Sequence, residues 1–182
     1  TQRTRFHIKG ANWAGFQAQG CVDQLYRHTI TEYIQFLVAN RFNSVRLPLS
    51  GVIVNENMTT GSLCGRYNGW ASLSILDDVL MRLEAAGIWA VLDMHNLAHP
   101  EYNQGLWCGG YTTCEPYAER EADLRRAWTI LADRYCHTRP NVLGADLFNE
   151  PFSASWGVGD DGSRWDLAAS RIGNMVLARC PQ

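Results

Sequence analysis

A carboxylate and an amide stand side by side at the end of an apolar segment, LGADLFNEP, at residues 143–151. Asn149 and Glu150 precede Pro151, and a strand-ending turn is one explanation, since Asn and Pro favour turns. Chemistry is the other explanation, because a carboxylic acid can donate and accept protons and an adjacent amide can hold a hydroxyl. The residue types therefore predict an acid–base group, for which a partner has to be sought elsewhere.

Polar or aromatic residues also lie in or just after three other apolar segments. Each has a structural explanation when taken alone. Arg46 could pair with Asp93 or Asp146, because a buried charge needs a partner, and His95 could be a hydrogen-bonded structural histidine. Separate structural explanations account less well for the fact that all these residues lie in or just after apolar segments. This shared position predicts that they form one site. The residues are Asn12 and Trp13, then Arg46, and finally Asp93, His95 and Asn96.

Short apolar segments that alternate with amphipathic ones must position these groups. We predict strands at residues 6–11, 44–49, 89–95 and 142–148, whose nearly continuous apolar character is typical of parallel strands covered on both faces. Apolar residues at three- and four-residue spacing predict helices within residues 30–38, 73–83, 124–135 and 165–175. This alternation indicates an α/β protein whose polar residues gather at the carboxyl ends of parallel strands.

Local signals at the helix ends and loops refine this assignment. Ser74-x-x-Asp77 and Ser163-x-x-Asp166 resemble capping boxes, and Gly87 suits the residue after a helix. The segment KGANWAG lacks the spacing of a glycine-rich phosphate loop, so nucleotide binding is not expected.

Composition narrows the class of protein. A net charge of −2 and a pI near 6.2 give no reason to expect a nucleic-acid partner or an acidic membrane surface. No segment approaches the roughly 20 apolar residues of a membrane span, and residues 1–10 do not resemble a signal peptide. Histidine and cysteine spacing suggests no metal site and no cofactor.

The cysteines favour an oxidising compartment. Six are present, at positions 21, 64, 108, 114, 136 and 180, and their even number permits disulfides. Cys108 and Cys114 share one loop in which a local bridge is easy, whereas Cys136 could equally be a free buried thiol. Asn57 begins a glycosylation sequon, which matters only in a eukaryotic secretory protein. Together these signals favour secretion, although the disulfide connectivity stays open.

Four segments carry a resemblance to a known family. KGANWAGF, FNSVRLPLS, GIWAVLDMHN and VLGADLFNEP are similar to successive strand motifs of glycoside hydrolase family 5, the cellulase family. The region WGVGDDGSRWDLAASRIGNMVL resembles the fourth-helix region of bacterial endo-β-1,4-glucanases of this family. The resemblance implies that residues 1–182 are a partial catalytic domain, the N-terminal (β/α)4 half of a (β/α)8 TIM barrel.

The resemblance also implies roles for individual residues in retaining hydrolysis of a β-linked polysaccharide. Glu150 would be the general acid/base, Asn149 would bind the sugar 2-hydroxyl, and Arg46 would hold the nucleophile. These roles agree with the chemistry, because a glycosidic oxygen needs a proton in order to leave and bonds to the 2-hydroxyl strengthen in the transition state. His95 would line the same subsite. The expected substrate-binding residues are Asn12, Trp13, Asn96 and Trp107, whereas core positions are expected for Trp89, Trp128 and Trp165.

The second carboxylate of the reaction is missing from the sequence. Retaining glycosidases place the acid/base and the nucleophile about 5–5.5 Å apart, and the resemblance puts the nucleophile on strand 7. Asp93 and Asp146 are better explained as interior structural groups. We expect the chain to be part of a longer product that supplies strands 5–8, because a closed barrel removes open sheet edges. The alternatives are a half-length protein that pairs with itself or with another half, and a non-catalytic sugar-binding remnant.

Substrate identity is less constrained than the reaction. The fourth-helix similarity favours a β-1,4-glucan, which would make the full-length product an endoglucanase and leave this fragment inactive by itself. A mannanase or a β-1,3-glucanase of the same family is the alternative, because a fold does not determine its substrate.

Overall fold

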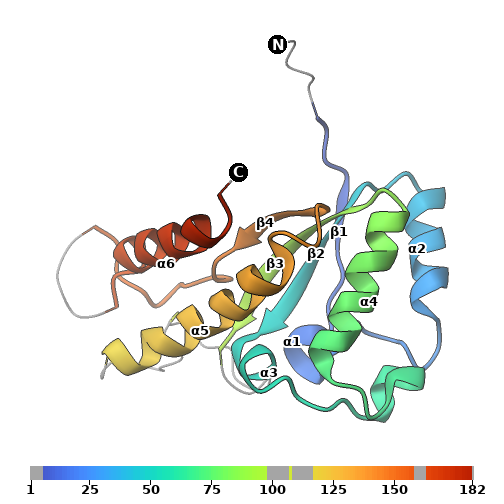
Figure 1. Cartoon of the computed structure of the whole chain (residues 1–182), viewed down its shortest axis with the longest axis horizontal. Helices are drawn as coiled ribbons and strands as arrows, with labels where there is room; N and C mark the ends of the chain where they lie inside the picture. The colour runs from blue at the N-terminus through green and yellow to red at the C-terminus, as the bar shows by residue number, and fades with distance from the viewer. Residues whose placement is uncertain (1–5, 98–106, 108–116, 158–162, 182) are drawn as a thin grey trace.

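A four-stranded parallel sheet with strand order β1-β2-β3-β4 forms the centre of the molecule (Figure 1). The computed structural model describes residues 6–97, 107, 117–157 and 163–181, with backbone only at 117–120. The parallel arrangement confirms the prediction from the apolar segments. The strands are β1 Gly10–Asn12, β2 Ser44–Ser50, β3 Trp89–Asn96 and β4 Val142–Asp146.

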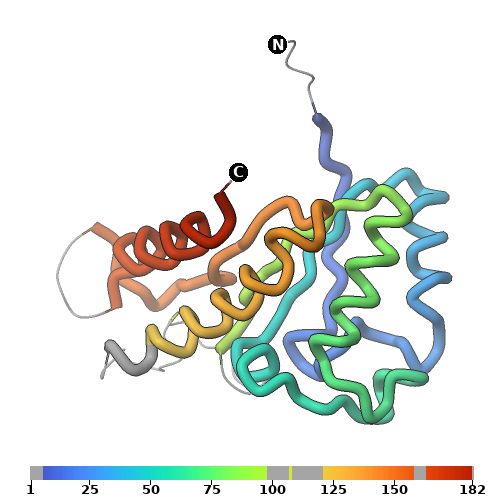
Figure 2. Tube along the Cα trace, viewed as in Figure 1, coloured from blue at the N-terminus to red at the C-terminus, as the bar shows by residue number. Residues whose placement is uncertain are grey.

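Four longer helices alternate with the strands, and three short ones occupy the connections that follow β1 and β2. In Figure 1, α2 and α4 lie together near the β1–β2 end of the sheet, and α5 and α6 lie together near the β4 end. The tube in Figure 2 shows the same strand–helix units following one another across the molecule. No helix in the described ranges is long and apolar enough to cross a membrane. The helices are α1 Phe16–Gln19, α2 Ile30–Ala39, α3 Gly51–Glu56, η1 Ser62–Tyr67, α4 Ser72–Ala85, α5 Tyr117–Tyr135 and α6 Trp165–Arg179.

The two faces of the sheet differ because side chains alternate along each strand. On β2 and β3, one set of alternating residues is apolar and fully buried as part of the main core cluster. The other set includes Arg46 on β2 and Asp93 on β3. The apolar face packs on the helices, and the opposite, inner face carries polar groups. The buried apolar set is Val45, Leu47, Leu49, Ala90, Leu92 and Met94.

Both edge strands are shorter than predicted. Pairing with β2 begins at Gly10, so the predicted residues 6–9 lie outside β1, and Phe6 and Ile8 are exposed. β4 ends at Asp146 instead of residue 148, although the Asn149 N–H still donates to the Met94 carbonyl at 2.9 Å. Apolar composition predicts a strand, but pairing partners decide where it starts and stops.

Neither predicted capping box is present. Ser74 lies inside α4, whose N-cap is Ala71, and Ser163 precedes Arg164, the N-cap of α6. A capping box occurs instead at α2, where Thr29 and Glu32 each accept a hydrogen bond from the other's backbone N–H.

Two helices end in the same hydrogen-bond motif with different residues at its left-handed position. After α4, the predicted terminator Gly87 has φ +69°, and Ile88 N–H donates to the Leu83 carbonyl. After α2, Arg41 has φ +59°, and Phe42 N–H donates to the Leu37 carbonyl. Both are Schellman motifs, in which glycine carries no Cβ penalty.

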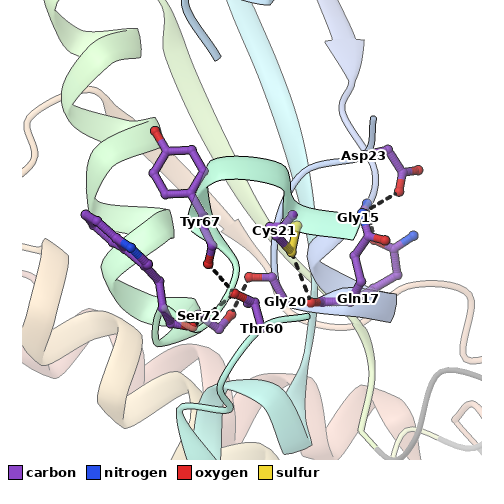
Figure 3. The surroundings of a disulfide bond; sticks show 11 residues. Gly15, Gln17, Gly20, Cys21, Asp23, Thr60, Tyr67 and Ser72 are labelled. Atoms are coloured by element: carbon purple, nitrogen blue, oxygen red, sulfur yellow. Dashed lines mark hydrogen bonds between the residues drawn. A yellow bond between two sulfur atoms is a disulfide. The ribbon is translucent and has the colours of Figure 1, made fainter. Parts of the chain in front are cut away.

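Two disulfides connect distant segments of the described chain, Cys21–Cys64 and Cys136–Cys180. The prediction left Cys136 open between a thiol and a bridge, and the structure has the bridge, whereas Cys108 and Cys114 lie outside the described residues. Figure 3 shows that Cys21 follows the turn at Gly20, whose carbonyl accepts a hydrogen bond from Ser72 at 2.8 Å. The bridge fastens the connection after β1 to η1, and the Ser72 hydrogen bond fastens the same connection to the start of α4.

Arg41→Gly should stabilise the protein by about 0.5–1 kcal/mol, because glycine adopts the left-handed conformation without a Cβ penalty. Thermal and urea unfolding of the purified protein would measure the change. The matched control is Gly87→Ala, at which a Cβ meets nothing within 4 Å, so its expected loss of about 1 kcal/mol is conformational. A loss of stability in Arg41→Gly would contradict this account.

Replacing both Cys21 and Cys64 by alanine should destabilise the fold by about 2–4 kcal/mol, because the bridge closes a long loop in the unfolded chain. The control is the double replacement of Cys136 and Cys180, whose sequence separation of 44 nearly equals the 43 of the first pair. Cys21 and Cys64 are fully buried and the second pair is half-buried, so the first loss should be the larger in urea unfolding. An unchanged midpoint in the first variant would refute the expectation.

Candidate active site

The Arg46 guanidinium is the centre of a polar cluster on the inner face of the sheet. Its Nη1 lies 3.2 Å from Asn12 Oδ1 and 2.9 Å from Asp93 Oδ2. Its Nε and Nη2 donate to Asp146 Oδ2 at 3.1 and 2.9 Å. Nη2 also donates to Asn149 Oδ1 at 2.9 Å. The predicted pairing of Arg46 with Asp93 or Asp146 is confirmed with both carboxylates.

Strand register explains why these residues meet. Asn12 is level with Arg46 across β1 and β2, and Asp93 is level with Asp146 across β3 and β4. Neighbours at the same level of a parallel sheet point to the same face. Arg46 is level with Val91, two residues before Asp93, and therefore shares the face of that carboxylate.

Asp93 is fully buried, and its two carboxyl oxygens have different surroundings. Oδ2 receives Arg46 and lies 2.8 Å from His95 Nδ1, whereas Oδ1 is buried without a hydrogen-bond partner among the described residues. Burial raises the pKa of the Asp93 carboxyl, and the hydrogen bond to His95 and the charge of Arg46 oppose that rise. Since a carboxylate only accepts, the proton is assigned to His95 Nδ1, which leaves Nε2 for other contacts.

Glu150 follows this cluster in an unusual backbone conformation. Its φ is +47°, the left-handed region that non-glycine residues seldom adopt, and its side chain is exposed. No hydrogen bond or ion pair in the described part of the chain involves its carboxylate. Such strain costs on the order of 1 kcal/mol and concentrates at functional sites. The backbone therefore directs this carboxylate to solvent beside Asn149, which Arg46 holds.

Three of the other predicted residues lie differently. Asn96 is buried, and its amide faces the Gln17 carbonyl at 3.5 Å. Trp107 is 0% exposed and donates its indole N–H to the Ser163 carbonyl at 2.9 Å, so its ring is not available to stack on a ligand. Trp13 is half-buried against Tyr33, with ring centroids 5.4 Å apart. The cluster thus unites Asn12, Arg46, His95 and Asn149 and excludes the Trp107 ring.

Two exposed aromatic residues were not among the predicted ones. Phe152 and Trp156 follow Glu150 on the same connection between β4 and α6. The sequence signal was available, because both are large aromatic residues among the small and polar residues of the segment NEPFSASWG. The expected core positions are confirmed for Trp128 and Trp165, which are buried, whereas Trp89 is half-buried.

A groove of about 590 Å³ runs along β4, α5 and α6, away from the polar cluster. Apolar side chains such as Leu92, Trp128 and Leu177 line it, together with the open edge of β4 at Gly144. Among the described residues, no group of three or more His, Cys, Asp or Glu side chains could hold a metal ion.

Comparison with known proteins agrees with the α/β fold of the chain. The family model for cellulase (glycosyl hydrolase family 5) matches residues 4–182. An endoglucanase of Paenibacillus polymyxa is 31% identical over 96% of this chain and 43% of its own length. The major extracellular endoglucanase of Xanthomonas campestris pv. campestris is 33% identical over 96% of this chain and 36% of its own length.

Solved structures show the same partial coverage. The catalytic domain of that Xanthomonas endoglucanase superposes with a TM-score of 0.82 over 98% of this chain and 51% of its own. A Pyrococcus horikoshii endocellulase in complex with cellotetraose has a TM-score of 0.81 and 28% identity, over 98% and 50%. The chain spans about half the length of these structures, and its four strand–helix units form the N-terminal half of a (β/α)8 barrel. It belongs to glycosyl hydrolase family 5, the cellulase family.

Proposed function

We propose that this chain is part of a retaining endoglucanase that hydrolyses β-1,4-glucan, with Glu150 as general acid/base. The observation that carries the proposal is the solvent-directed Glu150 carboxylate beside Asn149, whose side chain Arg46 holds at 2.9 Å. The nucleophilic carboxylate comes from the portion of the relatives' length that this chain does not span. The relatives' names, endoglucanase and endocellulase, support the substrate class.

Proton transfer from Glu150 makes the glycosidic oxygen a better leaving group. An exposed carboxyl group can reach that oxygen and can then take a proton from water in the second half of a retaining reaction. The left-handed backbone conformation of Glu150 costs free energy. The hydrogen bond from Asn149 N–H to the Met94 carbonyl, at the preceding residue, offsets that cost.

Asn149 is oriented for one particular hydrogen bond. Its Oδ1 accepts from Arg46 Nη2, so its amide Nδ2 is the atom left to donate toward a substrate. A donor fixed in this way suits the sugar 2-hydroxyl, whose bonds strengthen as positive charge develops on the ring. Arg46 acts here as a positioning residue, and its partly exposed guanidinium also suits it to hold an anionic nucleophile.

Two further proposals accompany the reaction. Secretion is supported by the disulfides and by the name of the extracellular Xanthomonas relative. The remaining half of the barrel is the expected partner of the open β4 edge and of the apolar groove along it.

A non-catalytic carbohydrate-binding half-barrel is the second candidate. The observation in its favour is that Asp93 and Asp146 are structural groups of the sheet: Asp93 is fully buried, and both carboxylates belong to the ion cluster that joins the strands. Binding of cello-oligosaccharide by residues 1–182 without turnover would support this candidate. A mannanase or β-1,3-glucanase is the alternative within the family, and comparing release of sugar from cellulose, mannan and β-1,3-glucan separates these substrates.

Glu150→Gln in the full-length gene product should lower kcat on carboxymethyl-cellulose by at least about 100-fold, because the amide cannot donate the catalytic proton. Reducing-sugar release measures the effect. Glu56→Gln, an exposed carboxylate at the end of α3, is the matched control and should keep the original rate. The 182-residue chain alone should show no hydrolysis, and turnover by it that Glu150→Gln abolishes would overturn this proposal.

Arg46→Lys should lower kcat by about 100-fold, because an ammonium group cannot reproduce the fork that contacts Asp93, Asp146 and Asn149. Arg66→Lys, at an exposed arginine of η1, serves as the control in the same assay. A rate unchanged by Arg46→Lys, with an unchanged melting temperature, would show that the fork does not position the reacting groups.

A further inference from the structure

Four arginine side chains line one open depression between α5 and α6. The two helices pack against each other (Figure 1), and the depression has a volume of about 580 Å³. Glu121 is the only carboxylate among its described lining residues. Its surface therefore carries an excess of positive charge, although the chain as a whole has a net charge of −2. The arginines are Arg125, Arg126, Arg171 and Arg179.

The one carboxylate is held mainly by a single arginine. Glu121 is 5% exposed, and its Oε1 and Oε2 accept hydrogen bonds from Arg171 Nε and Nη2 at 3.1 and 2.6 Å. A buried carboxylate needs such a partner, so this pair is a structural link between α5 and α6. Arg125 Nη1 lies 3.5 Å from the same Oε1, which is longer than the usual 2.7–3.2 Å of such a bond.

The other two arginines have weaker partners. Arg126 is exposed, its Nη2 lies 3.4 Å from the Asn55 carbonyl, and no ion pair within the described ranges includes it. Arg179 Nε lies 3.4 Å from Asp133, a carboxylate whose side chain is 62% exposed. Such surface pairs contribute little free energy. The guanidinium groups of Arg125, Arg126 and Arg179 can therefore bind an external anion without breaking the buried pair.

We propose that this depression binds an acidic polysaccharide through its uronic carboxylates. A planar guanidinium matches a carboxylate with two parallel hydrogen bonds. Arg171 and Arg179 are about two turns apart on α6, and Arg125 and Arg126 face the same depression from α5. Several cations on one surface suit a polymer with repeated carboxylates better than a single small anion. The choice of a polysaccharide rests on the proposed function, which brings such polymers to the protein.

A nucleic acid is the other polyanion to consider, and the lining does not favour it. Proteins that bind single strands combine cations with aromatic side chains on which bases stack. No aromatic residue lines this depression among the described residues. A uronic acid chain has no flat bases to stack, so cations alone suit it better.

The depression lies apart from the surface that the rest of a barrel would cover. It shares no lining residue with the apolar groove along β4. On α6, Arg171 and Arg179 line the depression, whereas Val176 and Leu177 line the groove. A second half of the barrel that packs into the groove would therefore leave the depression open. Glu150 lines neither, so a bound acidic chain would hold the protein on its substrate without filling the candidate active site.

The test measures binding by titration calorimetry with the full-length gene product carrying Glu150→Gln, which prevents turnover. The probes are a long oligogalacturonate, neutral cellohexaose and single-stranded DNA. Replacing both Arg126 and Arg179 by glutamine should raise the Kd for oligogalacturonate about tenfold and leave the Kd for cellohexaose unchanged. Raising NaCl from about 0.05 to about 0.5 M should weaken the oligogalacturonate complex, because salt screens exposed charges.

The matched control replaces Arg27 and Arg66, two exposed arginines outside the depression, by glutamine. It removes the same charge and should leave both Kd values unchanged. Equal weakening by the two double variants, or DNA binding as tight as that of oligogalacturonate through the same arginines, would overturn the inference.

The proposed function and this inference can fail separately. Hydrolysis of β-glucan by the unsubstituted protein without oligogalacturonate binding would leave the proposed function and overturn the inference. Binding that depends on Arg126 and Arg179, without hydrolysis, would support the depression as a site and contradict the proposed function.

Discussion

One guanidinium joins all four strands of the sheet across its inner face. Arg46 comes from β2 and contacts Asn12 of β1, Asp93 of β3 and Asp146 of β4. Charges that leave water need partners with good geometry, and a planar fork with five N–H donors can serve several acceptors at once. A slip of one residue in any strand would turn its polar group to the apolar face. The same contacts of Arg46 therefore fix both the register of the strands and the geometry of the site.

The inner face can carry this polar cluster because the apolar core lies on the other side of the sheet. Packing energy comes from the opposite face, where alternating residues such as Leu47 and Leu92 are buried against helices. Two disulfides restrain the connections outside the sheet. Since the helices and bridges hold the strands from outside, the inner face can keep a buried carboxylate, Asp93, one of whose oxygens has no partner in the described residues. A second half of the barrel would complete this face.

Much of this architecture was predictable because its signals are local or periodic. Apolar segments identified four parallel strands, and the need of a buried charge for a partner indicated that Arg46 could pair with Asp93 or Asp146. Details that depend on contacts between distant segments were not predictable. For example, β1 starts only at Gly10, where β2 pairs with it. Trp107 was expected to face a ligand because an aromatic ring can stack on a sugar, but it is buried and its indole N–H binds the Ser163 carbonyl, 56 residues away in the sequence. The serine-based capping patterns failed because neither serine is at an N-cap: Ser74 lies inside α4, and Ser163 precedes Arg164, the N-cap of α6.

Structural and chemical roles meet in Asn149. Its N–H continues the ladder to β3 through Met94, its Oδ1 is held by Arg46, and its chain continues into the strained backbone of Glu150. Because Asn149 is held by both its backbone and its side chain, the position of the next residue is also restrained. The left-handed conformation of Glu150 can therefore persist despite its cost in free energy. The orientation of the proposed acid/base is thus a consequence of the ion cluster that sets the strand register. For this reason a substitution that loosens Arg46 should act on chemistry as well as on stability.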